Sequence, residues 1–379
     1  MRSFKCTCGA TIFFDNSQCL SCGKSLGFLP KALDMVAFDK DGSGDIQTAH
    51  GSYRRCSNYE HEGVCNWLVS TQSSHELCQA CRLNNVIPNL AEPANRELWQ
   101  EVEQAKRRLI YSLDRLGLPV IPKTEDPVRG LSFDIKASVG DERVLTGHSD
   151  GLITLNLSEA DASQREKMRL SLKERYRTLL GHFRHEVGHY FWDRLVADAN
   201  RHDEFRRLFG DERADYAEAL KRHYASPPAP NYAETLISHY AASHPWEDFA
   251  ETFAHYLHMV DTLETAEAYG FAAAAGKTGS PDFERLMNEW YPLTVALNAL
   301  NRSMGLPDAY PFAISPVVKG KLGFAHELIQ AARRANSDAP PVETDEVPRD
   351  LLRRPLSGNQ KDNADLGRQS PLTLVVKPD

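Results

Sequence analysis

The feature that most constrains this chain is the stretch over residues 178–197, T-L-L-G-H-F-R-H-E-V-G-H-Y-F-W-D-R-L-V-A. Apolar side chains recur in it at helical spacing, which predicts a helix with one buried face. His185 and His189 are four residues apart, so on a helix their imidazoles point the same way. Glu186 follows the first histidine and lies beside the pair. This H-E-x-x-H pattern predicts two metal-binding histidines, with Glu186 as the general base that takes a proton from a metal-bound water.

A metal ion held by two histidines needs a third protein ligand, and a carboxylate on a second helix commonly supplies it. Residues 244–258, H-P-W-E-D-F-A-E-T-F-A-H-Y-L-H, predict that helix, with Pro245 in its first turn. Glu247 and Glu251 lie four residues apart on one face, so spacing alone offers both as the ligand. His255 continues this face and would be a fourth ligand if the metal centre were purely structural.

All eight cysteines lie in the first 81 residues and form two sets of four. A C-x-x-C turn brings two thiolates to one tetrahedral metal ion, and a second pair completes the site. The sets therefore predict two structural zinc ions in a small N-terminal ribbon region, where the metal supplies the folding energy. The pairs could also interleave, with Cys19 and Cys22 joining Cys78 and Cys81. The two sets are Cys6, Cys8, Cys19 and Cys22, and Cys56, Cys65, Cys78 and Cys81.

Composition narrows the class of protein. The chain has 379 residues and a net charge of −8, which gives no reason to expect a polyanionic partner. No apolar run is long enough to cross a membrane, and the start M-R-S-F-K-C-T-C-G lacks the apolar region of an export signal. We therefore expect a cytoplasmic protein without membrane association, whose cysteines bind metal rather than form disulfides.

The pattern along the chain predicts an α+β protein in three parts. Residues 1–90 would form the zinc-ribbon region with its two four-cysteine sites, and residues 91–336 a mainly helical, zincin-like domain with a small edge sheet. Residues 337–379 are rich in Pro, Asp and Asn and poor in aromatic residues, which predicts a disordered tail.

Two strands are predicted inside the second part, at residues 131–137 and 151–157. In zinc peptidases of this type, a strand before the active-site helix commonly forms the sheet edge that lines the cleft. We expect the second strand to be that edge, to which an extended peptide could add. Residues 39–50 imitate a calcium loop but carry His50 where a bidentate Glu is needed, so we interpret them as a polar turn.

With both cysteine sets, R-H-E-V-G-H-Y and H-P-W-E-D-F-A-E-T-F-A-H-Y-L-H, the chain resembles a bacterial family of zinc-binding metallopeptidases with an N-terminal zinc ribbon. The resemblance covers most of the chain, roughly to residue 334. A more distant similarity is to the catalytic domain of anthrax lethal factor, a gluzincin-type peptidase. There, a tyrosine lies seven residues before the ligand Glu and an acid four residues after it. This similarity implies Glu247 as the zinc ligand, Glu251 as the partner of a ligand imidazole, and Tyr240 near the oxyanion.

The expected protein is thus a zinc metallopeptidase with one catalytic and two structural zinc ions, acting on a peptide or protein substrate. One alternative is a binding module, whose ribbons recruit a protein or nucleic acid while the H-E-x-x-H domain is a non-catalytic, metal-bearing scaffold. Another is a structural metal centre closed by His255. Glu186 separates these interpretations, because a scaffold needs no general base.

Overall fold

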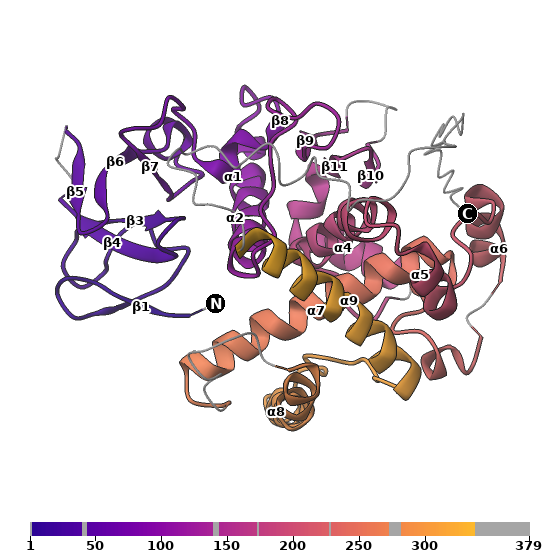
Figure 1. Cartoon of the computed structure of the whole chain (residues 1–379). Helices are drawn as coiled ribbons and strands as arrows, with labels where there is room; N and C mark the ends of the chain where they lie inside the picture. Colours follow the sequence, from indigo (N-terminus) through magenta and orange to yellow (C-terminus); the bar gives the residue numbers. More distant parts are fainter. Residues whose placement is uncertain are drawn as a thin grey trace.

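The computed structural model describes residues 2–39, 44–138, 144–172, 174–226, 229–272 and 282–337. A cysteine-rich region of short strands is followed by a mainly helical region with a small sheet (Figure 1), which confirms the predicted α+β class. The predicted tail beyond Ser337 and residues 40–43 of the calcium-like loop lie outside the described residues.

The N-terminal region contains three small antiparallel sheets, with the cysteines in the turns between and after their strands. A short helix, α1 (Gln79–Arg82), carries the last C-x-x-C. The strands are β1 (Phe4–Lys5) with β2 (Thr11–Ile12), β3 (Ser25–Leu29) with β4 (Asp34–Phe38), and β5 (Ile46–Thr48), β6 (Gly51–Arg55) and β7 (Leu68–Ser70).

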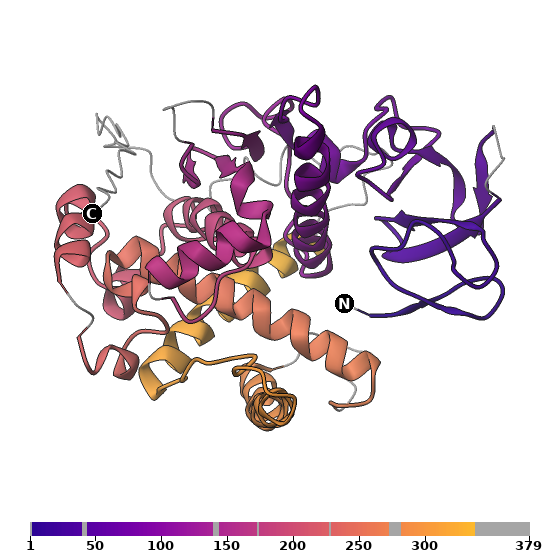
Figure 2. The same ribbon diagram turned by 180° about the vertical axis from the view of Figure 1, so that it is seen from behind.

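Helix α2 (Pro93–Arg115) stands between the two regions, as Figures 1 and 2 show from opposite sides. On one side its Tyr111 ring packs against Phe14, 5.2 Å away, and Phe28, 5.9 Å away. On the other side α2 packs on α4 (Leu179–Trp192). The apolar core is therefore continuous from the ribbon region into the helical region.

The sheet of the helical region has the strand order β10-β11-β9-β8. Strand β9 runs parallel to both neighbours, and β10 pairs antiparallel with β11. The prediction that the 151–157 strand is the edge is wrong, because the three-residue strand β10 lies outside it. A segment as short as G-H-S is too short to show the alternating pattern that predicts a strand. The bounds are β8 (Asn84–Val86), β9 (Ser132–Lys136), β10 (Gly147–Ser149) and β11 (Leu152–Asn156).

The long helix α7 (Pro245–Ala268) runs through the helical region and packs mainly against α4. Along the chain, helix α3 (Ala162–Ser171) lies between β11 and α4. The remaining helices cover the outside: α5 (His202–Phe209), α6 (Tyr216–Ala225), α8 (Phe283–Ser303) and α9 (Pro316–Ser337). Across the described ranges, no helix combines the length and apolar character that a membrane crossing requires.

Candidate metal centre

Helix α4 presents His185 and His189 on one face, toward Glu247 of α7. Its first turn is capped by the Thr178 hydroxyl, which accepts the Gly181 N–H at 2.9 Å. Phe183 and Val187 are completely buried on the opposite face. This burial fixes the rotation of α4 about its axis.

Helix α7 brings the carboxylates to the same place. His244 caps it, because its Nδ1 accepts the Trp246 N–H at 3.1 Å, and Pro245 occupies the first helical position. Glu247 therefore lies in the first turn, where the helix dipole favours a negative charge. It is only 1% exposed.

Three side chains converge on one point. The Oε2 atom of Glu247 lies 3.0 Å from His185 Nε2 and 3.4 Å from His189 Nε2. Zinc bonds to nitrogen and oxygen are ~2.0–2.1 Å long, so two ligands of a tetrahedral zinc ion lie ~3.4 Å apart. The observed spacing fits a zinc ion held by His185, His189 and Glu247.

The electrostatics of Glu247 suit a cation. Burial would raise the pKa of this carboxyl group, but His189 and His185 outweigh burial and hold its pKa well below the usual range. Glu247 is therefore an anion. His255 does not join the cluster, since its Nδ1 lies 2.9 Å from the Tyr310 hydroxyl and only three described residues form the set.

Glu251 contacts the other side of an imidazole rather than the cluster itself. Its Oε1 lies 2.7 Å from Nδ1 of His185, and the Ser238 side chain also hydrogen-bonds it. A carboxylate at Nδ1 keeps the proton on that nitrogen and leaves the Nε2 lone pair free for a metal ion. The structure thus gives Glu247 and Glu251 different neighbours, which spacing could not do.

Glu186 and Tyr240 also lie at this cluster. The Glu186 carboxylate is half-buried and makes no hydrogen bond within the described part of the chain, and burial raises its pKa. Tyr240 begins a short 3-10 turn before α7, and its ring centre is 5.8 Å from that of His185. Both side chains therefore border the cluster.

Three further residues border the cluster without having been singled out for it from the sequence. The Tyr216 hydroxyl donates to Oε1 of Glu247 at 2.7 Å. The centre of the Trp246 ring lies 3.8 Å from the centre of the His189 ring. The His148 ring, on β10, stacks on the same His189 ring with centres 6.0 Å apart. Trp246 directly precedes Glu247 in the sequence, so its place near the cluster could have been expected. Tyr216 and His148 are distant in sequence, and no motif links them to the histidines.

The eight cysteines form the two sets first suggested by sequence order, and the interleaved pairing does not occur. The Sγ atoms lie 3.6 Å apart for Cys6–Cys22, 3.8 Å for Cys8–Cys19 and 3.8 Å for Cys65–Cys78. Zinc–sulfur bonds of ~2.3 Å place the ligands of a tetrahedral zinc ion ~3.8 Å apart, so both sets fit zinc.

The two cysteine sets differ in exposure. In the first, hereafter the outer set, Cys8 and Cys22 are exposed, whereas all four members of the second, the inner set, are buried. The inner set lies against α2, whose buried Arg107 guanidinium donates to the carbonyl oxygen of Val64, next to Cys65. Helix α2 thus places a cation beside the inner set.

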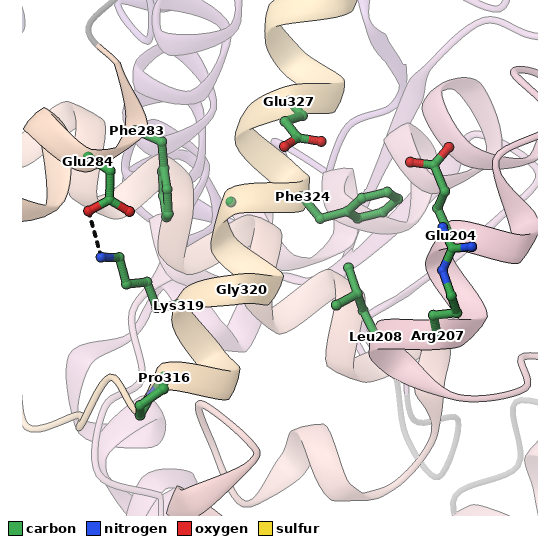
Figure 3. Close-up of a pocket in the computed structure, with 11 residues that line it drawn as sticks. Glu204, Arg207, Leu208, Phe283, Glu284, Pro316, Lys319, Gly320, Phe324 and Glu327 are labelled. Carbon is green, nitrogen blue, oxygen red and sulfur yellow. Dashed lines mark hydrogen bonds and ion pairs between the residues drawn. The ribbon is translucent and has the colours of Figure 1, made fainter.

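A separate hollow of about 560 Å³ lies on the surface between α5, α8 and α9, and Figure 3 shows the residues that line it. Phe324 and Leu208 lie in it, and the Lys319–Glu284 ion pair of 2.7 Å is at one side. None of the residues of the metal cluster lines this hollow.

Comparison with known proteins agrees with this geometry. A family model described as "Putative zinc-binding metallo-peptidase" matches residues 95–328, and a zinc-ribbon model matches residues 3–92. Relatives from Mycobacterium bovis and two strains of Mycobacterium tuberculosis, named as uncharacterized proteins, are 42% identical over 336 residues, 87% of this chain and 95% of theirs. No solved structure matches. The chain therefore belongs to the zinc-binding metallo-peptidase family that this model describes, with a zinc-ribbon region preceding the family domain.

Proposed function

We propose that this protein is a zinc-dependent peptidase of the H-E-x-x-H, gluzincin-like type that hydrolyses peptide bonds in peptides or proteins. The observation that carries the proposal is the cluster of His185 Nε2, His189 Nε2 and Glu247 Oε2, with the half-buried Glu186 carboxylate beside it. Three protein ligands are what catalytic zinc sites use, because a fourth position must remain available.

Each residue has a role in this proposal. Zinc held by the cluster would act as a Lewis acid and lower the pKa of a water molecule to around 7. Glu186 takes the proton of that water and passes it to the leaving amine nitrogen. The Tyr240 hydroxyl donates a hydrogen bond to the oxyanion that develops on the scissile carbonyl. Glu251 holds His185 in the tautomer and direction that the metal requires.

The ribbon region would hold two further zinc ions, one in each cysteine set, and these would be structural because four thiolates close the coordination shell. We propose residues 1–90 and 91–336 as the ribbon and peptidase domains. A protein or nucleic-acid partner of the ribbon region stays a prediction.

A peptide-library cleavage assay tests the proposal. Purified protein should cleave members of the library, lose activity when a chelator removes the metal from the cluster, and regain it when one equivalent of zinc is restored. His189→Ala, purified in parallel, controls for contaminating peptidases. Cleavage that the chelator and His189→Ala leave unchanged, or no cleavage by fully zinc-loaded protein, would contradict it.

A further inference from the structure

The two carboxylate oxygens of Glu247 have different partners. Oε2 faces the imidazoles of His185 and His189, at 3.0 and 3.4 Å. Oε1 accepts a hydrogen bond of 2.7 Å from the hydroxyl of Tyr216. Because Glu247 is 1% exposed, bulk water cannot compete for either oxygen.

We propose that Tyr216 is a positioning residue of the metal centre, whose hydroxyl occupies Oε1 of Glu247 and so presents Oε2 alone to the metal. The inference rests on the proposed function, because it takes Glu247 as a metal ligand. A carboxylate can bind zinc through one or both oxygens. Binding through both would take up the position that a catalytic zinc site keeps open.

Tyr216 is held in place by the structure that also positions Glu247. The His244 ring caps α7 through Nδ1, so its proton is on Nε2, which donates to the carbonyl oxygen of Ala214 at 3.1 Å. One imidazole therefore ties the helix that carries Glu247 to the backbone two residues before Tyr216. The Tyr216 ring then packs edge-on against His244, with ring centres 5.2 Å apart.

The start of α6 is fixed independently. The Asp215 carboxylate caps the helix by accepting the Glu218 N–H at 2.9 Å. Within α6, all of whose residues are described, Ala219 alone is buried. Few side chains of α6 therefore reach the core, and Tyr216, its first residue, makes the hydrogen bond to Glu247.

Tyr216→Phe tests the inference, because it removes the hydroxyl and keeps the ring. Tyr111→Phe is a matched control, since the Tyr111 hydroxyl makes a comparable bond of 2.6 Å to Glu264, away from the metal cluster. For each protein we would measure zinc affinity by chelator competition, and the visible absorption of cobalt exchanged into the cluster, with His189→Ala as the blank. The melting temperature, measured after zinc is removed from the cluster, would show whether a substitution destabilises the fold itself.

Tyr216→Phe should weaken zinc binding about 10- to 100-fold and lower the intensity of the cobalt bands, as expected for a change from four to five ligands. Tyr111→Phe should leave zinc affinity and the cobalt spectrum unchanged, whatever it does to the melting temperature. Wild-type zinc affinity and cobalt bands in Tyr216→Phe would overturn the inference, even if turnover fell. If wild type and His189→Ala bind the same number of zinc ions, the proposed function fails instead.

Discussion

At the scale of single residues, His185 distinguishes two carboxylates that share one helix face. Its Nε2 lies 3.0 Å from Glu247 and its Nδ1 lies 2.7 Å from Glu251. One imidazole can serve both, because a metal ion binds one ring nitrogen while the other donates a proton to an acceptor. The ring therefore separates the two carboxylates, with Glu247 at the nitrogen that faces the cluster and Glu251 at the other nitrogen.

Alanine substitutions should separate these two roles. Glu247→Ala should lose zinc from the cluster on dialysis against a mild chelator, while the cysteine-bound zinc remains. Glu251→Ala should keep the zinc when zinc is in excess, with affinity or turnover reduced about 10- to 100-fold. Zinc content by elemental analysis and turnover on a cleaved peptide check both. Loss of zinc from Glu251→Ala but not from Glu247→Ala would reverse the assignment.

The sequence could predict the residues of the cluster that lie at helical spacing. His185, Glu186 and His189 follow from one motif, and the similarity to a gluzincin pattern singled out Glu247. Tyr216 could not be predicted in this way, because its bond to Glu247 spans 31 residues and depends on how two helix ends meet. A contact between residues far apart in the chain produces no periodic pattern in the sequence from which it could be predicted.

At the scale of elements, the site depends on how closely α4 approaches α7. A Cβ atom added to Gly188 would lie 2.9 Å from the Cα and 3.1 Å from the carbonyl oxygen of Ala250. Both atoms are backbone and cannot move aside separately. The glycine inside H-E-V-G-H therefore lets α4 and α7 lie close enough for His185, His189 and Glu247 to converge.

Gly188→Ala should push α4 away from α7. Overpacking of this kind typically costs about 1–3 kcal/mol of folding stability, and the displaced ligands should bind zinc more weakly. The control is Gly320→Ala on α9, where nothing lies within 4 Å of the added atom and stability should rise slightly. Chemical denaturation and zinc competition measure both effects. An unchanged zinc affinity in Gly188→Ala would show that the close approach is not needed.

Sequence patterns located the long elements better than the short ones. Helical spacing predicts α4 and α7, since each has several turns on which a buried face repeats. The edge strand beside β11 could not be predicted, because β10 is three residues long and its pairing depends on tertiary contacts. The cleft-lining edge expected at residues 151–157 is therefore not at the edge of the sheet.

At the scale of the whole molecule, the two cysteine sets should release zinc at different rates. Cys8 and Cys22 are exposed in the outer set, whereas Cys56, Cys65, Cys78 and Cys81 are buried. A chelator that must contact the ion should therefore remove the outer zinc before the inner one. Time-resolved zinc release, with Cys22→Ser as a variant lacking one outer ligand, checks the order. Simultaneous release of both would contradict it.

The burial of Asp114, where α2 meets α1, should make the free energy of unfolding depend on pH. Burial raises the pKa of Asp114 to about 7, while Gln79 donates to it at 3.0 Å. Between pH ~4 and ~7 the folded protein therefore binds this proton when the unfolded chain has released it, and stability falls as pH rises through that window.

Asp114→Asn should remove this dependence, because the amide cannot ionise yet keeps an oxygen for Gln79. We expect the variant to be more stable than wild type at pH 8, by on the order of 1–3 kcal/mol, and the difference to shrink toward pH 5. Urea denaturation between pH 5 and 8 measures it. Asp203→Asn, at a side chain that is 93% exposed, is the control. Equal pH slopes in wild type and Asp114→Asn would show that Asp114 does not cause the effect.

The central claim is that Glu186 acts as a general base beside a zinc ion held by His185, His189 and Glu247. Comparing Glu186→Gln with wild type on a cleaved peptide, at matched zinc content, tests it most directly. The amide keeps the size of the side chain but cannot take the proton. The variant should retain its zinc and lose about 10²- to 10⁴-fold in kcat. Hydrolysis at the wild-type rate by zinc-loaded Glu186→Gln would contradict the mechanism.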